Sequence, residues 1–463
     1  MRNKSTYFDE IYHARTGYEF TQGSVPYETT HPPLGKVFIS WCITLFGMTP
    51  FGWRFAGAVA GILMLPGIYL LTKQLTKKTL PAAVACILMS LDCMHLTQTQ
   101  IATIDSYPVL FIIFAYFFML RYLQTDISVE PLRRAVVPLA FSGLFMGLSI
   151  ASKWIGIYAG LGLALLYAWH GIRHIRLRSE ADRLLQSPGF TQEQADRLLP
   201  YSSSRNRIVR SLFVISLGCV LFFIIVPAAI YLLSYLPYMA YNTQIHSFGD
   251  YLNAVWQSQL GMLRYHSQPG LGMDHYYYSP WYQWPVIWKP MYYAMEEYVP
   301  YASPVHYSIF SFGNPAVWWG GLVTLLICFL CWLAGHRYVL SGEPRNLSAP
   351  VIRWHFTLPS YDIRYGFLFI GLLAQYLPWV LVPRGTYIYH YFASVPFLLV
   401  SAGLCISALH DRMKKLSAVA AVLVCVLAAA AFILFFPYAS GLFVPREWLD
   451  IGGKILTVSY PGM

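Results

Sequence analysis

The chain has 463 residues, of which 57% are hydrophobic and only 11% are charged. Soluble domains carry about a quarter charged residues, so this composition excludes a soluble globular protein and indicates an all-α polytopic membrane protein. The net charge of +11 is explained by Lys and Arg gathered in loops on one side of the membrane, and no nucleic-acid partner is expected.

Ten apolar stretches have about the length that spans a bilayer. They are Phe51–Leu71, Leu80–Leu96, Tyr107–Tyr122, Ala135–Ser152, Trp154–Trp169, Leu212–Leu236, Pro315–Leu333, Ile363–Val382, Ile388–Leu409 and Leu416–Phe436. One set of alternate loops carries 21 of the 32 Lys and Arg residues, the other set carries 10, and Arg54 lies inside a span. Basic residues favour cytoplasmic loops, so the first set is predicted to be cytoplasmic.

This orientation divides the chain into five parts. They are an extracytoplasmic loop (1–49), spans that include a cytoplasmic basic loop at 171–210 (50–236), a Tyr/Trp-rich extracytoplasmic loop (237–314), further spans (315–438) and an extracytoplasmic tail (439–463). Both termini then face outward although the chain starts without a signal peptide. We hypothesise that one further helix once preceded Met1.

The eight cysteines do not suggest a disulfide framework or a metal site, because seven of them lie inside apolar spans. Cys328 and Cys331 form a CxxC pattern, but its position within an apolar helix favours packing. No compact group of metal ligands occurs, so a dependence on a divalent cation stays open.

The first outer loop contains two adjacent acids, Asp9 and Glu10, in "YFDEIYHARTGYEF". Thr6 and Asp9 have the spacing of a helix capping box, which would explain Asp9 without a function and would leave Glu10 without a role. Their location just outside the membrane favours a second interpretation, in which they face cationic residues at the ends of other spans.

The stretch "THPPLGK" follows in the same loop. His31 precedes a proline and is held extended, and Pro33 can begin a helix over Leu34–Phe46 that is too short to span and suits the membrane interface. The corner can be explained by structure alone, as a rigid turn into this helix. It could also direct His31 and Lys36 toward the acids.

Further ionisable residues stand at predicted outer ends of spans. Asp105 either caps its helix or is functional, and Lys153 either extends to lipid head groups or is functional. "LPWVLVPRGTYIYHYFASVPF" adds Arg384 and His390, and a cation there suits a phosphate. The loop "DHYYYSPWYQWPVIWKPMYY" is either an aromatic belt at the interface or a stacking surface for sugar or peptide.

Six of these stretches, in this order, resemble the protein O-mannosyltransferase family in its bacterial form. They are "FDEIYHARTGYE", "HPPLGK", "QIATIDSY", "GLSIASKWIGIYAG", "SPWYQWP" and "YLPWVLVPRGTYIYHYFASVPF", and they span residues 7 to about 400. The resemblance implies a GT-C-like membrane glycosyltransferase. The family has about eleven spans and an Asp-Glu pair in its first outer loop, and its donor is polyprenyl-phosphate mannose. One departure is Gln100, which stands where an Arg is expected near the donor phosphate.

The resemblance implies transfer of one mannose to Ser or Thr hydroxyls of secreted or membrane polypeptides, by an inverting displacement on the outer face of the cell membrane. The secretion machinery is one place where these acceptors could be met. Asp9 would then be the base that takes the hydroxyl proton, with Glu10 in support. Lys153 and Arg384 would stabilise the departing phosphate, with Lys36, His390, His31, Asp105 and Gln100 as further donor-site candidates and no metal.

Two other functions remain as alternatives. A related enzyme could transfer the sugar to a lipid or cell-wall polymer, since it would share the outer acid and the basic phosphate site. A transporter or flippase would instead place ionisable residues near the midplane within repeated halves, whereas here they lie toward one face and no internal repeat is found.

Overall fold

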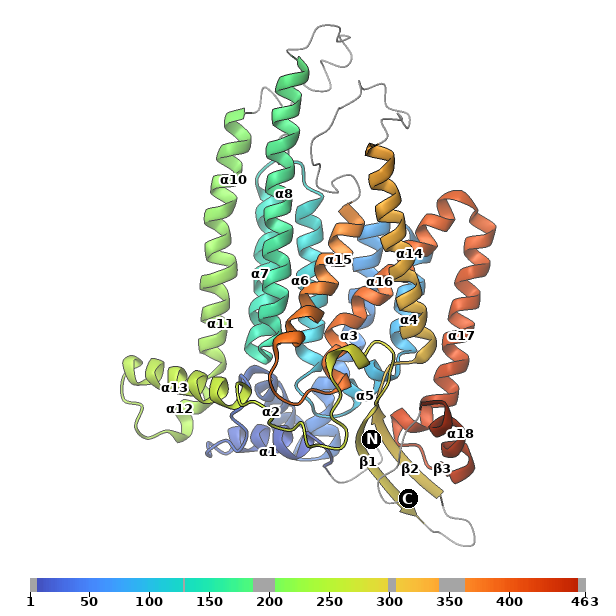
Figure 1. Ribbon diagram of the computed structural model, residues 1–463. Coiled ribbons are helices and arrows are strands. Elements are labelled where there is room, and N and C mark those ends of the chain that lie inside the picture. The colour runs from blue at the N-terminus through green and yellow to red at the C-terminus, as the bar shows by residue number, and fades with distance from the viewer. Residues whose placement is uncertain (1–5, 128–129, 186–204, 299–304, 341–362, 457–463) are drawn as a thin grey trace.

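We describe the protein from a computed structural model, which covers residues 6–127, 130–185, 205–298, 305–340 and 363–456. Long helices run side by side as a bundle, and short helices and a small sheet gather at one end (Figure 1). The long elements are α3 (Pro50–Thr76), α6 (Ser106–Leu123), α7 (Arg133–Ser152), α8 (Ile155–Leu185), α10 (Arg205–Val220), α11 (Val226–Ser234), α14 (Pro315–Leu340), α15 (Ile363–Tyr376), α16 (Val395–Arg412) and α17 (Lys414–Ser440).

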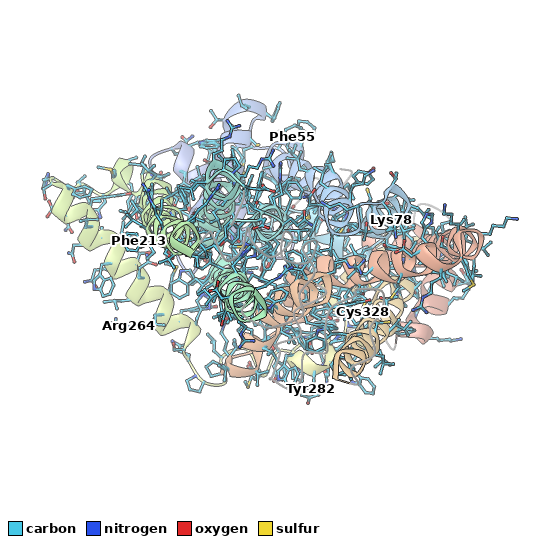
Figure 2. All side chains as sticks on the ribbon, turned by 90° about the horizontal axis from the view of Figure 1, so that it is seen from above. Phe55, Lys78, Phe213, Arg264, Tyr282 and Cys328 are labelled. Carbon is cyan, nitrogen blue, oxygen red and sulfur yellow. The ribbon has the colours of Figure 1, made fainter. Side chains whose placement is uncertain are left out.

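Within the described residues, nine helical segments are long and apolar enough to cross a membrane, or ten if one bent pair counts as a span. This confirms the predicted multi-pass helical architecture. The segment from Ile388 through α16 lies at the centre of the bundle, with 83% of its apolar window buried. By contrast, only 17% of the window in α17 is buried, so its apolar side chains face outward, as lipid-exposed helices require. Phe213 of α10, which is labelled in Figure 2, is 69% exposed and is a second example of such a side chain.

The predicted span Leu80–Leu96 is broken. It consists of α4 (Thr79–Ser90) and α5 (Cys93–Gln100), which meet at an angle of 57°. The cause is Asp92, whose carboxylate accepts from the backbone N–H of His95 at 3.2 Å and so starts a new helix. Its second oxygen accepts from the backbone N–H of Asn314 at 2.9 Å. The bend carries α5 and the loop after it toward the end of the bundle where the short elements lie.

That end is formed by segments distant in sequence: α1 (Glu10–Thr21), α2 (Leu34–Phe46), α12 (Pro237–Tyr241), α13 (Phe248–His266) and α18 (Arg446–Leu456) (Figure 1). Helix α2 has the predicted bounds. The ends of α8 and α10 that flank the basic segment lie at the opposite end of the bundle. The 3₁₀ turns η3 (Leu377–Leu381) and η4 (Ile388–Ser394) and the π turn η1 (Leu221–Ile225) complete the spans, and η2 (Trp281–Gln283) lies in the aromatic loop.

A three-stranded antiparallel sheet was not predicted from the sequence. It has the order β1 (Met291–Tyr298), β2 (Val305–Ser311) and β3 (Val444–Pro445), so it joins the aromatic loop to the C-terminal segment. The pairing of β1 with β2 is interrupted by a bulge between Tyr292 and Ala294. The sheet is small, and the fold remains mostly helical.

Candidate active site

The two adjacent acids lie at the start of α1, but the predicted capping box does not form. Helix α1 begins at Glu10, and Asp9 occupies the cap position without a side-chain hydrogen bond to the helix. The capping explanation based on Thr6 is therefore wrong. The backbone just before Asp9 is unusual, because Phe8 has a φ of 52°.

Glu10 is fully buried and anchors α1. Its carboxylate accepts from Nε of Arg54 at 2.6 Å and from the Nη2 atom of the same guanidinium at 2.7 Å. It also accepts from the backbone N–H of Ala102 at 2.9 Å. Arg54 is inside α3, so this pair fixes α1 to a membrane span and to the loop before α6. A two-point Arg–carboxylate contact holds both partners in a defined orientation.

Asp9 has no such partner in the part of the chain that the structure describes. Within the described residues, its carboxyl makes no hydrogen bond or ion pair, although it is largely enclosed by protein. Burial raises the pKa of Asp9 to about 7; the charge of Asp105 acts in the same direction, and Lys153 opposes it. This places the pKa in the range that suits a general base at neutral pH.

Asp105 and Lys153 form a buried ion pair, with 2.6 Å between Nζ and Oδ1. Asp105 makes no capping hydrogen bond to α6, and Lys153 is 7% exposed, so the capping and lipid-head-group interpretations are both wrong. The ammonium also lies 5.7 Å from the ring centroid of Tyr389. The two residues come from the ends of different spans and lie near Asp9.

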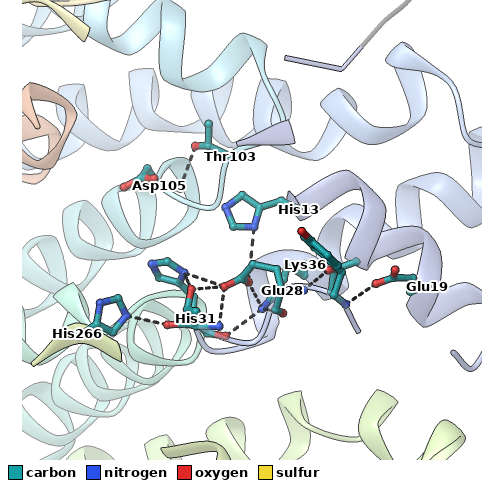
Figure 3. A network of polar contacts seen from close by, with 11 residues as sticks. His13, Glu19, Glu28, His31, Lys36, Thr103, Asp105 and His266 are labelled. Atoms are coloured by element: carbon teal, nitrogen blue, oxygen red, sulfur yellow. Dashed lines mark hydrogen bonds and ion pairs between the residues drawn. The ribbon is translucent and has the colours of Figure 1, made fainter. Parts of the chain in front are cut away.

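The "THPPLGK" corner is held by an acid that the sequence analysis missed (Figure 3). The carboxylate of Glu28 lies 2.5 Å from Nζ of Lys36 and 3.2 Å from Nδ1 of His31. Lys36 is fully buried and also donates to the backbone carbonyls of Glu28 and His31, at 2.9 and 3.0 Å. Burial opposes ionisation of Glu28, but the charge of Lys36 and the hydrogen bond with His31 lower its pKa well below the usual range.

The histidines around this corner are held neutral. Burial lowers the pKa of His31 to about 3, against the opposing effect of Glu28. Burial, and next the charge of Arg384, lower the pKa of His266 to about 4. His266 bonds the backbone carbonyl of Thr30 through Nε2 at 2.7 Å, so the end of α13 is tied to the corner (Figure 3).

Arg384 lies in the segment that links η3 to η4, and His390 lies within η4. Arg384 is half-buried, and among the described residues its guanidinium has no ion pair or hydrogen bond. Nδ1 of His390 lies 3.0 Å from the backbone nitrogen of Tyr387, and the ring packs against Trp379 and Trp284. The same ring nitrogen lies 3.0 Å from the backbone carbonyl oxygen of Tyr387, so it can accept from the N–H or donate to the carbonyl according to the tautomer of the ring.

The structure does not bring Gln100 into this group. Its side-chain amide donates to the backbone carbonyl of Ala439 at the end of α17, so it contacts another helix. Gln98, which was not selected from the sequence, is buried and donates to the Tyr293 hydroxyl at 2.7 Å. Arg54 was also missed as a partner, and its place inside an apolar span was the signal that could have found it. In the described part of the chain, no group of three His, Cys, Asp or Glu side chains could hold a metal ion.

The fold is similar to that of two solved membrane enzymes. The Saccharomyces cerevisiae protein O-mannosyltransferase Pmt1-Pmt2 complex bound to the sugar donor matches with a TM-score of 0.74 at 12% identity, covering 99% of this chain and 90% of that one. ArnT from Cupriavidus metallidurans bound to undecaprenyl phosphate matches with a TM-score of 0.51 at 13% identity, covering 98% and 73%. The protein is a multi-pass membrane glycosyltransferase with the GT-C fold.

Two family models match the sequence. "Dolichyl-phosphate-mannose-protein mannosyltransferase" matches residues 30–184, and "C-terminal four TMM region of protein-O-mannosyltransferase" matches residues 251–450. The chain belongs to the protein O-mannosyltransferase family. The polyprenol-phosphate-mannose–protein mannosyltransferase of Mycolicibacterium smegmatis is 24% identical over 399 residues, which cover 81% of this chain and 70% of the relative. The enzyme of the same name from Corynebacterium glutamicum is 23% identical and covers 90% and 78%.

Proposed function

We propose that this protein transfers one mannose from polyprenyl-phosphate mannose to Ser or Thr hydroxyls of polypeptides on the outer face of the cell membrane. One observation carries the proposal beyond family membership. Of the charged residues selected from the sequence, Glu10, Lys36, Asp105 and Lys153 are each in an ion pair, whereas Asp9 and Arg384 have no ion pair with any residue that the structure describes. The carboxylate of Asp9 is therefore available to bind an acceptor hydroxyl, and the guanidinium of Arg384 is available to bind a phosphate.

The proposed reaction is a single inverting displacement. The acceptor oxygen forms a bond to the anomeric carbon while the bond from that carbon to the phosphate oxygen breaks. Asp9 takes the hydroxyl proton as the oxygen attacks, and its raised pKa of about 7 makes it a stronger base than an exposed carboxylate. The electron pair of the broken bond leaves with the polyprenyl phosphate, which needs no proton.

Positive charge at the leaving group then replaces general acid catalysis. Arg384 is the first candidate, because a guanidinium can donate two parallel hydrogen bonds to a phosphate. Lys153 is the second, although Asp105 already balances its charge, and His390 can add a donor in the tautomer that carries the proton on Nε2. Glu10 and Lys36 act indirectly in this proposal, because each holds the first outer loop in place and neither is free to contact a ligand.

The deciding experiment uses membranes or purified protein with labelled polyprenyl-phosphate mannose and a Ser/Thr-containing acceptor polypeptide. We expect label that resists lipid extraction and is released by β-elimination. Asp9→Asn should abolish this product while donor binding is retained, and Asp274→Asn, the same change at an exposed acid of the aromatic loop, should have little effect. Label confined to a lipid or polymer product would overturn the choice of acceptor, and an active Asp9→Asn variant would overturn the choice of base.

The inverting course has its own test. The anomeric configuration of the donor and of the product mannose can be compared by NMR. Opposite configurations support a single displacement, whereas the same configuration would require a covalent intermediate and a different role for Asp9.

A further inference from the structure

The residue before the proposed base has a disfavoured backbone conformation. Phe8 has a φ of 52°, in the left-handed region where the Cβ of an L-residue crowds the backbone. Such conformations persist when the surrounding structure holds them, and they cluster at functional sites. The conformation matters here because it sets the direction in which the chain enters Asp9.

Aromatic packing holds Phe8 in this conformation. Its ring stacks on Tyr293 of β1, with 3.9 Å between the centroids and 18° between the planes. It also meets the ring of Tyr389 edge-on, with centroids 5.9 Å apart. Glu10 is fixed by Arg54 on the other side, so both neighbours of Asp9 are anchored, while the Asp9 carboxyl has no hydrogen bond to any described residue.

Tyr293 reaches Phe8 because of the bulge in the sheet. Tyr292 pairs with Phe310 and Ala294 pairs with Ile309, so Tyr293 is the extra residue without a partner on β2. A bulge bends its strand and redirects a side chain, and bulges are frequent next to active sites. Tyr293 is 4% exposed, and its neighbour Tyr292 stacks on Tyr277 instead.

The Tyr293 hydroxyl connects this clamp to the Asp105–Lys153 pair. It accepts from the amide of Gln98 at 2.7 Å, and the Gln98 carbonyl oxygen accepts from the Thr103 hydroxyl at 3.2 Å. The hydroxyl oxygen of Thr103 in turn accepts from the backbone N–H of Asp105 at 3.1 Å. Contacts therefore run without a gap from the residue before Asp9 to the acid that binds Lys153.

We propose that Tyr293 is a positioning residue for the transfer reaction. Its ring fixes Phe8 and thereby the Asp9 carboxyl, and its hydroxyl keeps that carboxyl in register with the Asp105–Lys153 pair through Gln98. This inference rests on the proposed function of Asp9. It assigns to the sheet, which carries no charged site residue, the task of aligning the base with the cations.

The test compares Tyr293→Leu, which removes the stack and the hydroxyl, with Tyr293→Phe, which keeps the stack. The matched control is Tyr292→Leu, the same change one residue away in the same strand. We expect Tyr293→Leu to lower kcat by about 10- to 100-fold, since a displacement of about 1 Å can have such an effect, with little change in the KM for the donor. Tyr293→Phe should keep most of the wild-type kcat, and the kcat of the Tyr292→Leu control should be close to that of the wild type.

Two further measurements separate positioning from simple destabilisation. Tyr293→Leu should shift the pH at which kcat/KM reaches half its maximum, because the surroundings of Asp9 change. In an Asp9→Asn background, Tyr293→Leu should have no further effect on the residual rate, as expected for residues that act as one unit. A loss of kcat matched by the control, or an equal loss in the Asp9→Asn background, would overturn the proposal.

The outcomes also separate this inference from the proposed function. If Asp9→Asn is inactive and Tyr293→Leu has wild-type kcat, only the positioning role fails. If Asp9→Asn is active, Asp9 is not the base, and the positioning role proposed for Tyr293 fails with that assignment. Should Tyr293→Leu not fold, Phe8→Leu removes the same stack from the other side and carries the same expectation, so a wild-type kcat in that variant would overturn the proposal.

Discussion

Replacing Asp9 by asparagine is expected to abolish transfer and, above neutral pH, to make the folded protein more stable. The two effects have one cause. The carboxyl is largely enclosed and has no partner within the described residues, so the folded protein favours its neutral form. An asparagine side chain has nearly the same shape and carries no charge, so it avoids the cost of burying an unpaired carboxylate.

The size and sign follow from linkage. The folded state raises the pKa of Asp9 from 3.8 to about 7, which is about 3 units, and each unit corresponds to about 1.4 kcal/mol. Between these two pH values the folded state holds the proton more tightly than the unfolded state. The wild type therefore loses stability as pH rises through 7, by up to about 4 kcal/mol, and this is an upper value because part of the carboxyl reaches solvent.

The measurement is thermal unfolding of wild type and Asp9→Asn in the same detergent from about pH 5 to pH 9. The Tm of the variant should exceed that of the wild type at pH 8 and above, and the difference should shrink as the pH falls below 7. Asp274→Asn should show no such pattern. A constant difference at all pH values, or a less stable variant at pH 8, would refute the reasoning, because Asp9 would then have a partner that stabilises its charge.

Three further predictions concern the same region. The kcat/KM for transfer should rise about tenfold per unit below pH 7 and level off above it, as a base with a pKa of about 7 must ionise; a flat profile would contradict this. Arg384→Ala should lower kcat/KM for the donor about 10- to 100-fold, because it removes a charge-assisted hydrogen bond to the phosphate. A change confined to the KM for the acceptor would exclude the phosphate role. Glu28→Gln should destabilise the protein by about 3–5 kcal/mol at neutral pH, because Lys36 is left buried and unpaired. That contribution is lost as pH falls through the lowered pKa of Glu28, so the Tm difference should narrow in acid, and Lys36→Met should recover part of it in the double variant.

The membrane spans could be predicted from the sequence because an apolar run of sufficient length must form a helix in a bilayer, where its backbone groups can bond only to each other. The break at Asp92 could not be located by hydropathy alone, since the residues on both sides of it are apolar. The sheet was missed for a different reason. The segment Met291–Tyr298 follows a run of Tyr and Trp, and its partner β2 pairs in turn with β3, where Val305 lies opposite Pro445, 140 residues further along the chain.

The ionisable residues of the predicted outer loops could be selected because each stands at an unusual place for a charge. Their pairing could not be predicted, since Glu10 and Arg54 are 44 residues apart and Asp105 and Lys153 are 48 apart. Glu28 was within reach of the sequence, because it lies eight residues before Lys36 at the start of a proline-rich corner. Tyr293 could not be selected from the sequence, because its proposed role depends on a bulge that no local pattern indicates.

In the proposed mechanism, the pairing of charges explains how an acid-poor membrane protein can keep a usable base. Each buried cation that forms a pair needs its own acid: Arg54 has Glu10, Lys36 has Glu28 and Lys153 has Asp105. These pairs fix the loops that surround Asp9. We therefore propose that its neighbours and the stack on Phe8 set the position of its carboxyl, which no described residue bonds directly. A base held by direct hydrogen bonds would have a lowered pKa and would accept a proton poorly. Anchoring the residues on either side avoids that conflict, because it places the carboxyl accurately and leaves its pKa high.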